Sequence, residues 1–115
     1  MPFGLQWFEK ESSQGRVGVR TVEELPAITL LEANHEFPGP YTFKAIGRVE
    51  NGFVARVVAA VREELAESVD PPFKVREAVG GRHVSVTLEP TVQTAYQVLA
   101  VYRRIRKIAG LVLLW

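Results

Sequence analysis

Apolar and polar residues alternate most clearly from Tyr41 to Val49, directly after the proline-bracketed turn at residues 37–40. Successive side chains of a β-strand point to opposite faces, so this alternation predicts a first strand with one buried face. The residues expected to face the core are Tyr41, Phe43, Ala45 and Val49. The opposite face carries Thr42, Lys44, Ile46 and Arg48.

A helical period follows over residues 52–68. Apolar residues recur there at the i, i+3, i+4, i+7 spacing of one buried stripe: Val54, Val57, Val58, Val61 and Leu65. Asn51 is the expected N-cap, because a short polar side chain can accept a hydrogen bond from the first turn. Two prolines, Pro71 and Pro72, end the helix.

Two further strands are predicted at residues 73–80 and 83–89. Gly80 and Gly81 join them, since glycine readily takes the positive φ of a tight hairpin. The side chains expected to point inward are Phe73, Val75, Val84, Val86 and Leu88.

The second long helix begins at Pro90-Thr91 or, alternatively, at Thr94, where Thr94 and Gln97 have the spacing of a capping box. Its expected buried stripe is Ala95, Val98, Leu99, Tyr102 and Ile105. A fourth strand follows over residues 111–115. A short helix at about 28–34 is expected to precede the first strand.

This order of elements, β-α-β-β-α-β, predicts an α+β fold of the ferredoxin-like kind. It is a four-stranded antiparallel sheet with two helices on one face. Right-handed crossovers interlock the two βαβ units and make the first and third strands central.

Composition and charge limit the classes of protein to which the chain can belong. The chain has 115 residues, enough for one core, and its 47% hydrophobic and 23% charged content is a globular balance. No apolar run approaches the roughly 18 residues of a membrane span, and no secretory signal is recognisable, so a cytoplasmic location is expected. Residues 1–27 read as a flexible acidic leader before a domain at 28–115. Residues 1–36 hold three basic and six acidic side chains, whereas residues 37–115 hold eleven and seven.

The sheet face without helices is one candidate interaction surface. It should display Lys44, Lys74, Arg76, His83, Ser85 and Thr87, with Val112 or Leu114 from the last strand. An anionic partner, a second copy of the chain or the acidic leader folded back in cis would suit these residues. Plain exposure to water is an equally ordinary interpretation, because antiparallel sheets commonly leave one face solvated.

The loop between the first strand and the first long helix is the candidate ligand site. Gly47, Arg48, Asn51 and Gly52 place backbone N–H groups, a guanidinium and an amide where a helix N-terminus favours a small anion. The alternative is a strand end followed by an N-cap.

Several kinds of chemistry find no support in the residues. The chain has no cysteine, and its two histidines, His35 and His83, lack metal-ligand spacing, so no metal or cofactor is expected. No nucleophile with a partnered base can be nominated, so the chain is expected not to be an enzyme. RNA-binding modules of this fold stack bases on aromatic residues of the third strand, but residues 83–89 contain none. RNA binding therefore rests only on a mildly basic surface.

Three stretches together resemble the YbeD-like bacterial family, a family of unknown function. They are the string Phe37-Pro-x-Pro-Tyr-x-Phe-Lys-x-x-Gly47, the Ser85-Val-Thr strand after a glycine hairpin, and the segment from Tyr102 to Trp115. The resemblance covers about Leu30 to Leu114.

The resemblance implies a ferredoxin-like fold similar to ACT regulatory domains, which bind small molecules such as amino acids and transmit that binding to a partner enzyme. It implies a ligand beside the loop at 47–52 and no catalytic residues. The function expected from the sequence is thus a regulatory or protein-interaction domain that associates with a protein partner or with itself and binds a small anionic ligand. An RNA-binding module is the alternative.

Overall fold

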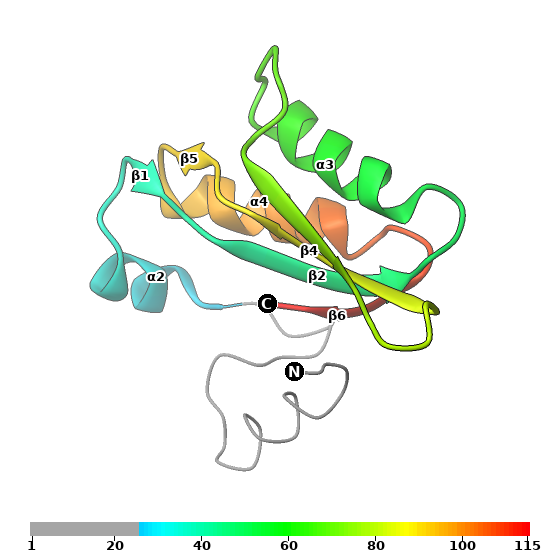
Figure 1. Cartoon of the computed structure of the whole chain (residues 1–115). Helices are drawn as coiled ribbons and strands as arrows, with labels where there is room; N and C mark the ends of the chain where they lie inside the picture. Colours follow the sequence, from blue (N-terminus) through cyan, green and yellow to red (C-terminus); the bar gives the residue numbers. More distant parts are fainter. Residues whose placement is uncertain (1–25) are drawn as a thin grey trace.

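The computed structural model describes residues 26–115, so the acidic leader predicted at 1–27 lies outside the described residues except for its last two. In chain order the elements are α2 (Ile28–Asn34), β1 (Gly39–Pro40), β2 (Phe43–Arg48), α3 (Phe53–Glu64), β3 (Phe73–Glu77), β4 (His83–Leu88), β5 (Thr91–Val92), α4 (Ala95–Ile105) and β6 (Leu111–Leu114). Figure 1 shows α3 and α4 side by side on one face of the main sheet. None of the helices in this part of the chain is long and apolar enough to cross a membrane.

The main sheet has four strands in the order β3-β4-β2-β6, and every neighbouring pair is antiparallel. The α+β class and the central position of the first and third predicted strands, β2 and β4, are confirmed. A two-stranded ribbon of β1 and β5, in which Gly39 lies opposite Val92, was not predicted. Two-residue strands are too short to show an alternating pattern, so the sequence carries no signal for this ribbon.

The core lies between the sheet and the two long helices. Its largest fully buried side chains are Phe43, Leu88, Ile105, Val57, Val61, Val86, Val92, Val98 and Val101. Within this core, Tyr41 and Tyr102 place their hydroxyl oxygens 3.1 Å apart in a buried hydrogen bond. This bond connects the entry to β2 with α4 and satisfies two polar groups inside an apolar core.

Local capping and turn signals determine where α4 begins and where α3 ends. α4 begins at the later of its two candidate starts, because Thr94 Oγ1 accepts a hydrogen bond from the backbone N–H of Gln97 at 3.2 Å. The Gln97 side chain in turn accepts from the backbone N–H of Gln93 at 2.7 Å. α3 ends at Glu64, short of the predicted residue 68, since Ala66 has a φ of +55° that no helix accommodates.

Ion pairs connect the solvent sides of the two long helices. Arg104 Nε donates to Glu64 Oε1 at 2.9 Å, and Arg104 Nη1 lies 3.2 Å from Glu63 Oε1. These contacts use one of the basic residues that the sequence places in the last turn of α4.

The predicted burial of three side chains was wrong. Val49, Phe73 and Val75 were expected in the core, but they are 45%, 43% and 47% exposed. Their alternation is correct: Phe73 lies opposite buried Leu88, and Val75 lies opposite buried Val86. β3 is an edge strand of the sheet, so the helices cover its inward side chains only partly.

Candidate functional site: an apolar groove beside an edge strand

The outer edge of β3 is the first component of the site. Ala78 N–H donates to the His83 carbonyl at 2.9 Å, and Glu89 N–H donates to the Pro72 carbonyl at 3.0 Å. In an antiparallel ladder the hydrogen-bonded positions alternate, so the even-numbered residues of β3 direct their backbone groups toward β4. The backbone N–H and carbonyl groups of Phe73, Val75 and Glu77 therefore point away from the sheet. Within residues 26–115 no strand pairs with this side of β3.

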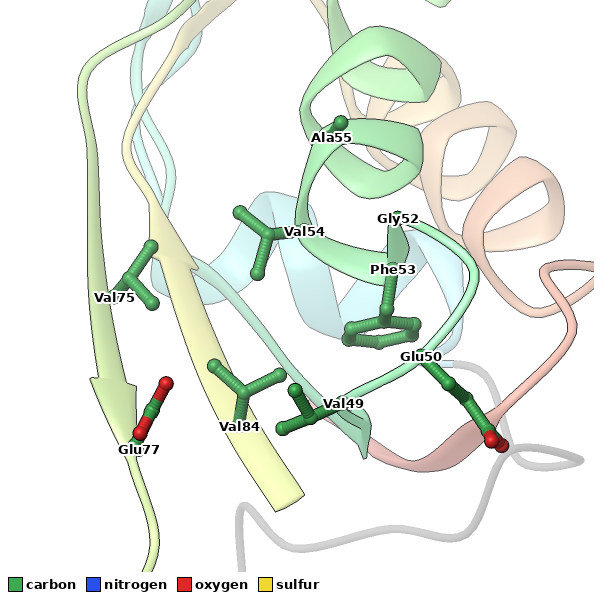
Figure 2. A pocket seen from close by; sticks show the side chains of 9 residues that line it. All are labelled: Val49, Glu50, Gly52, Phe53, Val54, Ala55, Val75, Glu77 and Val84. Carbon is green, nitrogen blue, oxygen red and sulfur yellow. The ribbon is translucent and has the colours of Figure 1, made fainter. Parts of the chain in front are cut away.

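A hollow of about 300 Å³ lies along the same edge, between β3 and the start of α3. We call it the edge groove. Its lining residues are Val49, Glu50, Gly52, Phe53, Val54, Ala55, Val75, Glu77 and Val84. Figure 2 shows the aliphatic side chains from β3, β4 and α3 converging on it; Glu77 and Glu50 lie toward the end where β3 enters its hairpin, with the Glu50 carboxylate directed away from the valines. The groove is thus an apolar surface with carboxylates at one end.

The loop that closes this end is held by a four-residue turn. Phe53 N–H donates to the Glu50 carbonyl at 3.2 Å, and the two residues between them, Asn51 and Gly52, have φ values of +55° and +67°. Asparagine and glycine are the residues that accept this left-handed geometry at least cost. The prediction that Asn51 is the N-cap was therefore wrong: Gly52 occupies the cap position, and no side chain caps α3.

Gly47 serves the packing of Phe53. A Cβ added at Gly47 would meet ring atoms of Phe53 at 2.4 Å, so glycine at this position allows the ring to pack closely against β2. The ring in turn forms the floor of the edge groove beside Val49 and Val84. One glycine thereby shapes both the core and the groove.

The four predicted ligand residues are adjacent but do different things. Gly47 lies under Phe53, Gly52 lines the groove, Arg48 Nη1 is 3.9 Å from Glu50 Oε2, and the Asn51 carbonyl accepts from Arg56 Nε at 2.8 Å. The carboxylate of Glu50 repels an anion at this end of α3, while the apolar walls accept aliphatic groups. Binding of an anion by these four residues stays a prediction.

The open sheet face brings the predicted interaction residues into three rows. Lys44, Thr87 and Lys74 lie side by side across β2, β4 and β3, as do Ile46, Ser85 and Arg76. Arg48 and His83 are opposite each other in the third row. Lys74 and Arg76 are exposed, and Lys44 Nζ lies 5.3 Å from the centre of the Trp115 ring.

Ser85 was expected to be displayed on this face, but it is only 5% exposed. It lies on the central strand β4 with Ile46 opposite it on β2 and Arg76 opposite it on β3, so a short side chain there has a neighbour on each side; Ile46 is itself only 3% exposed. Either Val112 or Leu114 was expected on the same face, and Leu114 is not displayed there. It lies opposite Ala45 and is buried in the core, whereas Val112 is 43% exposed.

The sequence missed the edge groove because the residues that line it follow the core pattern. Val49 and Val75 have the period of buried residues, and period alone does not show where helix cover ends. A usable signal was present nevertheless. An apolar core-phase residue on a strand that topology places at a sheet edge is a candidate for an exposed apolar surface.

The described residues show no cluster of side chains with the geometry of a metal site. In the part of the chain that the structure describes, no three His, Asp or Glu side chains gather closely enough to hold a metal ion. His35 packs against the ring of Tyr41 at 4.9 Å between centroids.

The fold and the site together define a small α+β domain with an apolar groove at an accessible sheet edge. Comparison with protein families finds one matching family model, DUF493, described as a protein of unknown function, over residues 32–114. The chain belongs to the DUF493 family. No curated protein matches it.

Proposed function

We propose that this chain is a non-enzymatic regulatory or protein-interaction domain of the cytoplasm, and that a protein partner docks at the edge groove. One observation carries the proposal: the groove combines exposed aliphatic side chains with backbone groups of β3 that no described residue pairs. Each of these features is a known route of protein recognition.

The energetics favour a protein over a small polar molecule. Val49 and Val75 each leave almost half of their surface exposed, and covering apolar surface contributes roughly 25 cal/mol per Å². A volume of about 300 Å³ accommodates only a few aliphatic side chains, so a partner gains further free energy by contacting the strand beside the groove.

We further infer that the domain is a ferredoxin-like, ACT-like member of a YbeD-like family. The strand order β3-β4-β2-β6, with two helices on one face, supports this inference. The two-stranded ribbon of β1 and β5 is then an addition to that arrangement. The family shown for the chain is of unknown function, as is the YbeD-like family in the resemblance.

Two other functions have less support. Binding of a small anion at Gly47–Gly52 is opposed by the Glu50 carboxylate next to Arg48. RNA binding would use the basic end of α4, but Arg104 there is engaged by Glu63 and Glu64, and β4 carries no phenylalanine, tyrosine or tryptophan.

Site-specific photo-cross-linking tests the proposal. A photoreactive phenylalanine analogue is placed at Val75 in one sample and at Val112, a similarly exposed valine on the edge strand β6, in the control. We expect a discrete cross-linked protein adduct in cells of the source organism from position 75 and none of the same mass from position 112. Equal adducts from both positions, or none from position 75, would refute docking at the edge groove.

A further inference from the structure

The edge groove and the outer edge of β3 restrict the partner to a narrow chemical class; this inference rests on the proposed function and makes it more specific. Backbone groups of Phe73, Val75 and Glu77 point outward over a strand of five residues. An extended segment can pair with them as an additional strand, because main-chain hydrogen bonds supply the affinity and alternate side chains supply the specificity.

The two faces of an added strand would meet opposite environments. Side chains on the helix side would meet the edge groove, with its valines and the carboxylate of Glu77. Side chains on the other side would lie beside Lys74 and Arg76, which are exposed and make no ion pair within the described residues. Apolar residues therefore fit the first side and acidic residues fit the second. Glu77 repels an acidic residue placed on the wrong side.

A second copy of the same strand does not fit. Because odd-numbered residues point outward, a symmetric antiparallel pair of two β3 strands aligns Val75 with Val75, Phe73 with Val75, or Val75 with Glu77. These registers place Lys74 opposite Arg76, Lys74 opposite Lys74, or Arg76 opposite Arg76, respectively. Like charges directly opposite each other destabilise strand pairs, and charged residues on edges are a common means of preventing self-association.

We propose that the outer edge of β3 binds an extended segment in which acidic residues alternate with aliphatic ones, and that the segment continues the sheet beyond β3. The aliphatic side chains fill the edge groove, and the acidic side chains pair with Lys74 and Arg76. The same two cations that disfavour a second copy select this acidic strand.

Binding of a short synthetic peptide tests the proposal on the full chain. The probe is a capped heptapeptide that alternates glutamate and valine. Two control peptides are a lysine–valine alternation of the same length and a peptide of the same composition with all glutamates before all valines. Titration is followed by amide chemical shifts at low and at physiological salt.

We expect the alternating acidic peptide to bind at least tenfold more tightly than either control, to shift the amides of Phe73, Val75 and Glu77, and to weaken as salt rises. The double variant Lys74→Glu, Arg76→Glu should reverse the preference toward the lysine peptide. Both residues are exposed, so circular dichroism should show an unchanged fold.

Three results would overturn the proposal: equal binding of all three peptides, shifts confined to other elements, or dimerisation of the free chain through β3. If position 75 still cross-links to a protein while the acidic peptide fails to bind, docking at the edge groove stands and the acidic-strand partner is rejected. If both experiments fail, the proposed function fails with it.

Discussion

Gly47 lies against the ring of Phe53 so closely that a single added carbon at residue 47 would come within 2.4 Å of the ring. This contact couples the second half of β2 to the first turn of α3. It also holds the ring as the floor of the edge groove. The backbone of β2 and the shape of the groove therefore depend on each other.

Gly47→Ala should lower the free energy of unfolding by about 1–3 kcal/mol, the usual cost of forcing extra volume into a packed site. Denaturant unfolding measures it. Phe53→Leu removes two of the three ring atoms nearest to the added carbon, so the double variant should lose less than the sum of the single variants. Strict additivity would contradict the contact.

Thr94→Ala should cost about 1 kcal/mol, because it removes the side-chain acceptor for the Gln97 N–H at the start of α4. Thr94→Ser, which keeps the hydroxyl, should restore most of the stability. Thr91→Ala is the matched control at the other candidate start, where the threonine is exposed and belongs to β5. A larger loss of stability at residue 91 than at residue 94 would contradict the assignment of Thr94 as the N-cap of α4.

Tyr41→Phe should cost about 0.5–1.5 kcal/mol through loss of the buried hydrogen bond to Tyr102. Tyr96→Phe, at a tyrosine that is 67% exposed, should leave the unfolding midpoint unchanged. Thermal or denaturant unfolding distinguishes them. Identical midpoints for all three proteins would show that the hydroxyl pair contributes nothing.

Val75 and Val86 lie opposite each other in the sheet but differ in burial, at 47% and 0% exposed. Val86→Ala should therefore cost about 2 kcal/mol, the value expected for removing two buried carbon atoms and leaving a small void. Val75→Ala should cost less than half as much. Equal losses of stability would indicate that Val75 is packed as fully as Val86, which would contradict its exposed position in the groove.

The sequence predicts those features that depend on a local period. Alternation identified β2 and β4, the i, i+3, i+4, i+7 stripe identified α3, and Gly80 and Gly81 take the positive φ values expected of the hairpin. These features were predictable because burial of a periodic face is the main force that orders each element.

Other features depend on neighbours that a period does not reveal. Asn51 and Gly52 both take positive φ, so a turn replaced the expected cap. Val49 and Val75 keep the core phase but lie where α3 no longer covers the sheet, so the groove emerges only from the arrangement of three elements. Ser85 is buried on a central strand, where Ile46 and Arg76 lie opposite it on the two neighbouring strands.

The central claim is that the outer edge of β3 is open in the free chain and accepts an acidic strand. Hydrogen exchange of individual backbone amides tests it most directly, because the pattern should alternate along one strand. In the free protein we expect fast exchange at Phe73, Val75 and Glu77 and slow exchange at Lys74 and Arg76, whose amides face β4. The alternating glutamate–valine peptide should slow the three fast amides by at least tenfold. Slow exchange at all five residues without peptide, or unchanged fast exchange at saturating peptide, would contradict the claim.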